Sequence, residues 1–303
     1  MNFFKKKYRS LKWRLIKRFG ATQQYADYLY FLEFGKKINW DKPEDLNQWI
    51  NWLAFNTDTS EWSRLSDKYA VRDYVKECGL NDTLVPLLAV WDAPDDIDFS
   101  ILPDKFVLKM NNGSGDVRII KDKSKADLKE IKSFFSDHFN RPFGIDSAEP
   151  HYLKIKPKII AEQLLNPEKQ STPSSSLIDY KVWCINGEPR YIKVYLNRTK
   201  EKTEMTGFDT EWNLRDDINA YSDHFIPPKK PINRPMHLDK MLEYARILSK
   251  SFPQVRVDFY EVDGKIYFGE LTFTSSCGRM TSFSDSAQKE LGDMIAKKLT
   301  NNK

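Results

Sequence analysis

Two carboxylates and a guanidinium stand close together near the end of the sequence. Arg256 and Asp258 lie two residues apart in the apolar run Val255–Tyr260, and Glu270 lies in a second apolar run downstream. Residues two apart project from the same face of a strand. The Asp263-Gly264 pair between the two runs suits a tight hairpin turn. Antiparallel pairing about that turn would bring Glu270 close to the level of Arg256 and Asp258.

This hairpin has two chemical interpretations. Charged groups in apolar strands are expensive to bury unless they pair with one another or bind a metal. Carboxylate oxygens suit Mg²⁺, which proteins hold through one or two carboxylates while phosphates and water complete the shell. An Arg–carboxylate salt bridge on an exposed hairpin face explains the same residues. The hairpin alone leaves these two interpretations about even.

A lysine followed by a loop of small residues is the second chemical signal. Lys109 ends the apolar run Phe106–Met110, and Gly113-Ser114-Gly115 follows shortly after it. Backbone N–H groups of such a loop can contact phosphate oxygens, with the lysine as a point charge. The loop is not a Walker A sequence, which needs Gly-Lys-Ser/Thr before a helix. Taken singly, it is more often only a hairpin turn.

Two further apolar runs carry charged residues. Glu162 lies near the end of 158–165, and Asp179 and Lys181 share one face of the run 179–185. Each charge by itself is typical of a solvated strand edge. The order of the four signals along the chain is more informative than any one of them.

The periodicity of apolar residues predicts the elements that must position these side chains. The front of the chain is mainly helical, and β-type runs begin at residue 85, so the chain is expected to be α+β. Pro43 and Glu44 suit a first helical turn, and Ser66 is an N-cap candidate. Helices are expected at 4–19, 25–38, 43–55, 66–79, 125–139, 237–252 and 286–299, and strands at 85–90, 106–110, 117–120, 158–165, 179–185, 190–196, 255–260 and 266–273.

In combination, the motifs resemble the ATP-grasp superfamily. Phe-Val-Leu-Lys-x-Asn-x-Gly-Ser-Gly, Asp-Tyr-Lys, Arg-Val-Asp-Phe-Tyr and Phe-Gly-Glu-Leu-Thr-Phe are similar to motifs of its TupA-like branch, which is associated with teichuronopeptide and other surface-polysaccharide biosynthesis. The resemblance runs from about Ser66 to the C-terminus. It implies an ATP-grasp fold in which two α+β lobes sandwich ATP. The chain then divides into a helical N-terminal region at 1–65, a lobe with the phosphate loop at 66–165, and a C-terminal lobe with the metal site at 166–303.

The same resemblance assigns ATP and Mg²⁺ as cofactors and gives individual residues roles. Many ATP-grasp ligases have Glu-x-Asn where this chain has Glu270-Leu271-Thr272, so a neutral hydroxyl takes the place of the Asn ligand. The implied roles are phosphate contacts for Lys109, Lys181 and, by its position, Lys68; closure over the phosphates by Gly113, Ser114 and Gly115; an adenine hinge at Glu162 and Leu164; Mg²⁺ ligation by Asp258, Glu270 and Thr272; and stabilisation of the transferring phosphoryl group by Arg256.

The acceptor side has weaker candidates. Backbone amides around Ser276-Cys277-Gly278, together with Arg256, can stabilise a tetrahedral oxyanion. Arg198 and Arg279 are candidates for binding an anionic acceptor, although both can also be plain exposed charges. With no clearly placed His partner, Cys277 is expected to line the pocket or to be a buried residue rather than to act as a nucleophile.

Three function classes follow. The first is an ATP-dependent carboxylate–amine ligase that joins an amino acid or other amine to a uronic-acid-containing surface polysaccharide, or its lipid-linked precursor, through an acyl phosphate. The second is an ATP-grasp kinase acting on a hydroxyl of a glycan or small molecule. The third, disfavoured because the lysines and carboxylates occur together, is a non-catalytic nucleotide-binding module of a polysaccharide assembly system.

Composition limits the partners and the compartment. The net charge of +5 comes from residues 1–20, which hold eight Lys or Arg and no acid, while the other residues hold 40 basic and 43 acidic side chains. A nucleic-acid partner is therefore not expected. Three scattered cysteines and the lack of a long apolar stretch favour a reducing, cytoplasmic setting. The basic amphipathic helix expected at 4–19 would dock either on the protein's own acidic surface or peripherally on anionic lipid or a lipid-linked glycan.

Overall fold

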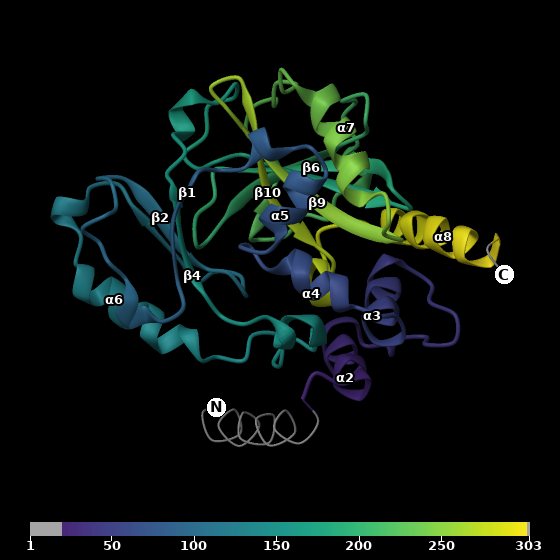
Figure 1. Ribbon diagram of the computed structural model, residues 1–303. Helices are drawn as coiled ribbons and strands as arrows, with labels where there is room; N and C mark the ends of the chain where they lie inside the picture. Colours follow the sequence, from purple (N-terminus) through teal and green to yellow (C-terminus); the bar gives the residue numbers. More distant parts are fainter. Residues whose placement is uncertain (1–19, 302–303) are drawn as a thin grey trace, which may run out of the picture.

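The computed structural model describes residues 20–301, so the basic helix expected at 4–19 lies outside the described residues. Two sheets organise the chain (Figure 1). A four-stranded antiparallel sheet has the order β1-β4-β2-β3, and a six-stranded sheet has the order β10-β9-β5-β6-β7-β8. The strands are β1 (Leu87–Trp91), β2 (Phe106–Met110), β3 (Val117–Ile120), β4 (Ile159–Gln163), β5 (Asp179–Ile185), β6 (Glu188–Leu196), β7 (Thr203–Phe208), β8 (Phe225–Ile226), β9 (Gln254–Val262) and β10 (Lys265–Thr272).

The two faces of the small sheet differ, and the charged residues of β2 and β4 lie on only one of them. Along β2, Phe106, Leu108 and Met110 are buried, whereas Lys109 between them is half-buried. The buried side packs against α6 (Leu128–Phe139) through Ile131 and other apolar residues. This alternation leaves the opposite face, with Lys109, free to carry polar chemistry.

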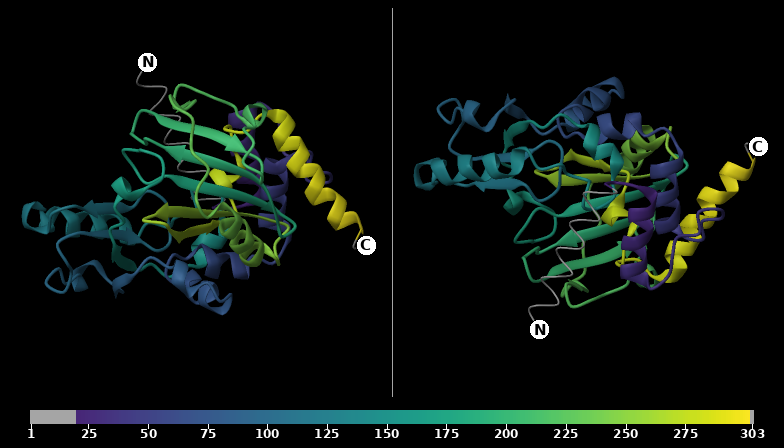
Figure 2. Two further views of the ribbon diagram at one scale, coloured as in Figure 1. Left: turned by 90° about the horizontal axis from the view of Figure 1, so that it is seen from above. Right: turned by 90° about the horizontal axis from the view of Figure 1, so that it is seen from below.

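Helices cover both faces of the large sheet. One face packs against α4 (Ser60–Ser66), α5 (Val71–Glu77) and α7 (Leu238–Ser249) in the largest apolar core. Part of the other face packs against α3 (Leu46–Asn56) and α8 (Asp285–Asn301). Figure 2 shows α8 and the N-terminal helices on the side of the large sheet away from α6 and the small sheet. The uncovered part of that second face is where charged strand residues gather.

The remaining described elements are helix α2 and the 3₁₀ segments. Helix α2 (Gln23–Phe34) begins after its N-cap Thr22 and ends at Gly35, whose φ of 68° is left-handed.

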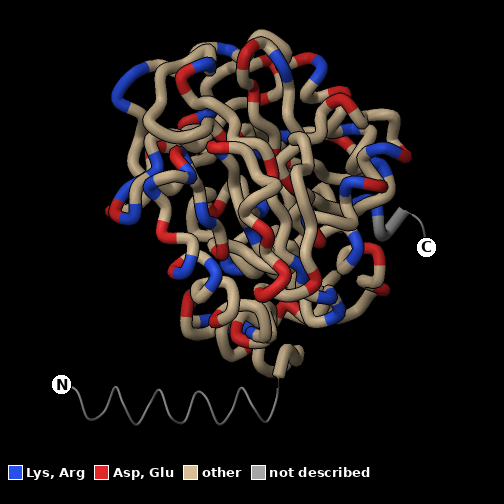
Figure 3. The backbone as a smooth tube through the Cα atoms, turned by 60° about the vertical axis from the view of Figure 1, so that its left-hand side comes forward, with Lys and Arg blue, Asp and Glu red and all other residues tan. Residues whose placement is uncertain are grey.

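None of the described helices is both long and apolar enough to cross a membrane. Basic and acidic residues are intermixed along the described chain (Figure 3). The 3₁₀ segments are η1 (Asn81–Thr83), η2 (Pro94–Asp96), η3 (Lys123–Lys125), η4 (Pro150–Lys154), η5 (Pro167–Lys169), η6 (Asp216–Ile218) and η7 (Ser275–Gly278).

Most of the expected elements are confirmed, and the strands β2, β3 and β5 have the expected bounds. Three helix starts were wrong. The helix expected from 125 begins at Leu128, because the Asp127 carboxylate caps it. The Asp45 carboxylate caps α3, so Pro43 and Glu44 precede that helix. Ser66 is the last residue of α4, and α5 begins only at Val71. Three elements were not expected, namely α4, β7 and β8. The division of the chain at residues 65 and 165 stays a prediction.

Candidate functional site

A network of ion pairs crosses the uncovered face of the large sheet. Strand register places Lys181 of β5 and Glu270 of β10 on either side of Asp258 in β9. Arg256 Nε donates to Asp258 Oδ1 at 2.6 Å, and Arg256 Nη2 lies 2.7 Å from both Asp258 Oδ2 and Glu270 Oε1. The Lys181 ammonium also contacts Asp258 Oδ2. The expected meeting of Arg256, Asp258 and Glu270 is therefore present.

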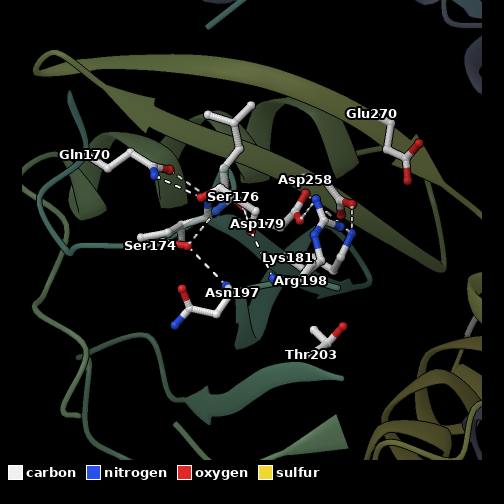
Figure 4. Close-up of polar contacts among 12 residues, drawn as sticks. Gln170, Ser174, Ser176, Asp179, Lys181, Asn197, Arg198, Thr203, Asp258 and Glu270 are labelled. Carbon is white, nitrogen blue, oxygen red and sulfur yellow. Dashed lines mark hydrogen bonds and ion pairs between the residues drawn. The ribbon is translucent and has the colours of Figure 1, made fainter. Parts of the chain in front are cut away.

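The network continues to the far edge of the site. Asp179 Oδ1 lies 3.9 Å from Lys181 Nζ, and Asp179 Oδ2 lies 2.6 Å from Arg198 Nη2. Charges thus alternate from Arg198 to Glu270. Figure 4 shows Arg198, Asp179, Lys181 and Asp258 close together, with Glu270 on the neighbouring strand. The two ends of the network are the accessible members, because the Arg198 side chain is 41% exposed and that of Glu270 is 37% exposed.

The serine-rich link at 171–176 positions the Arg198 end. Ser174 Oγ accepts a hydrogen bond from the Asn197 backbone N–H at 3.1 Å, and Ser176 Oγ accepts one from the Arg198 backbone N–H at 3.2 Å (Figure 4). These bonds hold the chain just after β6. The serine-rich link therefore fixes the backbone from which the Arg198 side chain extends.

Burial and charge act in opposite directions on the carboxylates. Burial raises the pKa of Asp179, although Lys181 and Arg198 oppose that rise. Burial also acts to raise the pKa of Glu270, but Arg256, Lys68 and Lys181 together lower it to about 2. Glu270 is therefore ionised at neutral pH and available as an anionic ligand.

A second group of charges lies on the face of the small sheet that does not pack against α6. Glu162 of β4 is paired with Lys109 of β2, with 2.7 Å between Oε2 and Nζ. Arg72 of α5 contacts the other oxygen of Glu162 at 3.4 Å and donates to Val85 O at 2.9 Å. The side chain of Glu162 thus binds basic groups, while Leu164, just beyond β4, is half-buried.

The small-residue loop joins the two groups of charges. Lys68 donates to the backbone oxygen of Gly113, and Ser114 and Gly115 are exposed. Burial lowers the pKa of Lys68, Glu270 of the large sheet opposes that shift, and Lys109 of the small sheet adds to it. The two lysines and the loop therefore face the same region as the ion-pair network.

Buried Asn111 anchors this loop, a role that sequence reasoning missed. Its amide donates to Lys156 O at 3.0 Å, its side-chain oxygen accepts from the Lys158 N–H at 2.6 Å, and its backbone oxygen accepts from the Lys68 N–H at 3.0 Å. Arg72 was also missed. The available signals were an amide directly after the strand that ends at Met110 and a lone arginine in a short helix.

A cavity of about 270 Å³ opens beside the network. Three cationic side chains of the site, Lys181, Arg198 and Arg256, contribute to its wall. Of the substrate candidates from the sequence, Arg198 lines it, whereas Cys277, Gly278 and Arg279 are not among its lining residues. The others that line it are Trp183, Tyr195, Thr203, His224, Phe225, Ser276, Met280 and Ser282.

A protein-family model described as TupA-like ATPgrasp matches residues 48–296. The chain belongs to the TupA-like ATP-grasp family. No curated protein matches it. Among solved structures, D-alanine–D-alanine ligase from Bacillus anthracis is similar, with 16% identity and a TM-score of 0.49, covering 78% of this chain and 68% of that one. The ATP-grasp ligase PsnB, complexed with a minimal precursor, shares 13% identity at a TM-score of 0.43, covering 80% and 63%.

The D-alanine–D-alanine ligase from Helicobacter pylori shares 13% identity with this chain, at a TM-score of 0.44 and with coverage of 84% and 66%. The TupA-like chain thus spans about two thirds of the length of these ligases. It has the ATP-grasp fold, preceded by a helical N-terminal region.

The donor set of this TupA-like protein fits a Mg²⁺ ion shared with a nucleotide. Glu270 Oε1 already accepts from Thr272 Oγ1 at 3.0 Å, so Thr272 lies beside the carboxylates. Asp258 is 1% exposed, and both of its oxygens contact Arg256 or Lys181. Among the described residues, no group of three or more His, Cys, Asp and Glu side chains is arranged to hold a metal alone. Two carboxylates with phosphate oxygens are a usual Mg²⁺ shell.

The thiol of Cys277 is not activated in this TupA-like site. Burial and the nearby Glu149 raise its pKa to about 12, with Arg279 opposing them. A thiol with such a pKa is protonated at neutral pH and is a poor nucleophile. Arg279 donates to the backbone oxygens of Ser147 and Cys277, each at 3.2 Å, so it holds the chain locally.

Proposed function

We propose that this TupA-like ATP-grasp protein is an ATP- and Mg²⁺-dependent carboxylate–amine ligase. The observation that carries the proposal is the alternating ion-pair network. It ends at one side on the accessible guanidinium of Arg198, which can bind an anion, and at the other side on ionised Glu270. One end suits an anionic acceptor and the other a metal-bound phosphate. A ligase that activates a carboxylate needs both kinds of site within one active site.

The lysines and Arg256 supply charge neutralisation. Lys68, Lys109 and Lys181 converge on the region between the sheets, and each is near a carboxylate that ATP phosphates can replace as its partner. Phosphoryl transfer depends mainly on positioning and on stabilising spread negative charge. Asp258 and Glu270, with Thr272 beside them, would hold Mg²⁺, which would supply positive charge against the phosphates. Arg256 would then turn from its carboxylates to the transferring phosphoryl group.

The reaction has two steps. An acceptor carboxylate oxygen attacks the γ-phosphorus of ATP, which forms an acyl phosphate and releases ADP. A neutral amine then attacks the acyl carbon, loses a proton and expels inorganic phosphate, which leaves an amide. Arg256 and backbone N–H groups of the segment around Ser276-Cys277-Gly278 are the candidates for stabilising the oxyanion between these events.

The cavity supports a small acidic sugar as the acceptor. Arg198 and His224 offer polar contacts for an anion, and Trp183, Tyr195 and Phe225 offer aromatic surface. Its volume of about 270 Å³ is near the lower end of small-molecule sites, roughly 300–1,000 Å³. We therefore propose a uronic acid unit of a surface polysaccharide or lipid-linked precursor as acceptor, and an amino acid or other amine as donor.

The place of the reaction is proposed from the need for ATP and from the basic N-terminus. We place the enzyme in the cytoplasm, with residues 1–20 making a peripheral contact with the inner face of the membrane. Deletion of residues 1–20 should reduce sedimentation with anionic liposomes at low salt but not at high salt. Unchanged sedimentation of the truncated protein rejects the membrane contact.

Product analysis tests the ligase proposal. The purified protein is incubated with Mg²⁺-ATP and an array of uronic acids and amines, and products are identified by mass spectrometry. Formation of ADP, phosphate and a new amide supports the ligase. A phosphorylated acceptor would instead favour a kinase. Nucleotide binding without turnover on any pair would favour the non-catalytic module.

A further inference from the structure

The segment Thr274–Ser282 forms one wall of the cavity in an unusual backbone conformation. Ser276, Met280 and Ser282 from this segment line the cavity. Ser276 and Cys277 have φ angles of 48° and 57°, in the left-handed region. Such a conformation is unfavourable for a non-glycine residue and persists only where the surroundings enforce it. We call Thr274–Ser282 the acceptor loop.

Helix α3 holds the acceptor loop through two asparagines one turn apart. Asn51 Nδ2 donates to Gly278 O at 2.9 Å. Asn47 Nδ2 donates to Met280 O at 2.9 Å, and Asn47 Oδ1 accepts from the Met280 N–H at 2.8 Å. Both asparagine side chains are buried. Residues four apart lie on the same helix face, so a single face of α3 makes all three bonds.

The approach of helix and loop depends on a glycine. A Cβ atom at position 278 would lie 2.2 Å from Asn51 Nδ2, and Gly278 has a φ of 65°. A side chain at this position would therefore collide with Asn51 and adopt an unfavourable backbone conformation. The contact between α3 and the loop is thus built into both segments.

Other buried polar groups hold the remaining parts of the loop. Gln288 of α8 donates to Met280 O at 2.9 Å. Lys193 of β6, which is fully buried, donates to Ser282 O, and Thr274 donates to Glu149. Ser275 Oγ accepts from Arg256 Nη1 at 3.4 Å. The loop therefore connects the helical front of the chain to the guanidinium at the centre of the site.

We infer that α3 is part of the binding machinery, with Asn47 and Asn51 as positioning residues that hold the acceptor loop in the form that binds the acceptor. This inference rests on the proposed ligase function for the identity of the ligand. It assigns a role to the helical region before the lobes, for which sequence motifs offered none. Apolar packing of α3 against α8 fixes the helix itself, so the asparagine bonds act specifically on the loop.

The chain offers a matched control on the same helix. Asn56 Nδ2 donates to Trp52 O at 2.9 Å, and Asn51 Nδ2 donates to Asn47 O at the same distance, so both make the same local bond to a residue four earlier. Asn56 is exposed. Comparing Asn51→Ala with Asn56→Ala therefore cancels the local helix bond and leaves the buried contact of Asn51 with Gly278.

Cys277 reports on the loop without any need for turnover. In a Cys78→Ser background, the rate of its reaction with 5,5′-dithiobis(2-nitrobenzoate) is measured, since Cys184 is only 1% exposed. Losing this buried hydrogen bond should make the loop open more often, so the thiol of Asn51→Ala should react roughly tenfold faster. Asn56→Ala should react at the parent rate. Thermal unfolding checks that each variant is folded, and Asn47→Ala replaces Asn51→Ala if the latter is not.

Binding measurements separate positioning from general destabilisation. With a non-hydrolysable ATP analogue present, D-glucuronate is the probe in calorimetric titrations. Asn51→Ala should weaken its affinity roughly tenfold and leave the nucleotide affinity within about twofold, while Asn56→Ala changes neither. Equal thiol rates in the two variants overturn the inference, as does an unchanged glucuronate affinity despite faster thiol reaction. If the parent protein does not bind glucuronate, the acceptor class of the proposed function fails, and the thiol rates alone decide whether α3 holds the loop.

Discussion

Arg256 and Asp258 form a two-point ion pair in which both carboxylate oxygens are engaged, at 2.6 and 2.7 Å. Because Asp258 is also buried and contacts Lys181, its charge is balanced inside the protein when no metal is present. Removing one partner of such a group leaves the others with uncompensated charge. The pair therefore links the stability of the site to its chemistry.

Replacing the central carboxylate should abolish turnover. Asp258→Asn keeps the shape of the side chain but removes the charge that holds Arg256 and Lys181. We expect Mg²⁺-ATP turnover to fall by at least about 100-fold, as for the loss of a key electrostatic group. Asp263→Asn is the control, since Asp263 lies at the exposed tip of the same hairpin and pairs with exposed Lys169. Normal turnover in Asp258→Asn would show that the metal assignment is wrong.

Metal binding should depend on nucleotide. Because basic groups already contact both Asp258 oxygens, a divalent ion must compete with Arg256 and Lys181 unless phosphates draw them away. Electron paramagnetic resonance of Mn²⁺ should therefore show at least roughly tenfold weaker binding without ADP than with it. In Arg256→Met, the binding without nucleotide should strengthen. Equal affinity of the parent protein with and without ADP contradicts this competition.

Glu270 should make the free energy of unfolding fall more steeply as the pH is lowered. Its pKa is lowered to about 2 from the ordinary 4.5, so the folded state holds it ionised where the unfolded state binds a proton. Its stabilising contribution is full above about pH 4.5 and is lost as the pH falls towards 2. Denaturant unfolding between pH 3 and 6 should show a smaller loss on acidification in Glu270→Gln than in the parent. Asp179 is present in both proteins, so the difference isolates Glu270, and identical pH profiles refute the shift.

Lys193 should change the free energy of unfolding at neutral to alkaline pH. Burial lowers its pKa from 10.5 to about 7, so between these values the unfolded state binds more protons than the folded state. Stability of the parent protein should therefore rise with pH across this window relative to Lys193→Met, by up to about 4 kcal/mol at pH 10. Urea unfolding of both proteins at pH 7 and pH 10 measures the difference. A constant difference between the two pH values argues against the lowered pKa.

Arg198 should affect the acceptor and not the nucleotide. It lines the cavity and belongs to the end of the network away from Glu270. With substrates identified by the product screen, Arg198→Met should raise the KM for the acceptor by roughly tenfold to 100-fold, the value of a hydrogen bond to a charged group. The KM for ATP should change little. Lys200→Met, at a neighbouring exposed position, is the control. An effect confined to the KM for ATP would place Arg198 on the nucleotide side.

Local sequence patterns determined much of the site. Lys109, Lys181 and Asp258 are charges within otherwise apolar strands, a pattern that predicts both the strands and their functional face because side chains alternate across a sheet. The turn at Asp263-Gly264 was also predictable, since both residues adopt the positive φ that such a turn requires. The adenine hinge at Glu162 and Leu164 stays a prediction.

Tertiary structure decided how the two carboxylates meet. Phe268 is paired with Phe259, and continuing that register would place Glu270 opposite Val257, on the buried apolar face. A bulge at Gly269 shifts the pairing by one residue, so that Glu270 faces Asp258 instead. A Cβ atom at Gly269 would lie 3.0 Å from Asp258 O, which explains a glycine at this point.

The acceptor loop likewise depends on contacts that no local pattern contains. Asn47 and Met280 are far apart in the sequence, and only the packing of α3 beside α8 brings them together. Residue types and alternation, which are local, determined the chemical groups and the strands that carry them. The register shift at Gly269 and the hydrogen bonds from α3 to the acceptor loop arise from long-range pairing and burial. Only the folded chain therefore determines where those groups act.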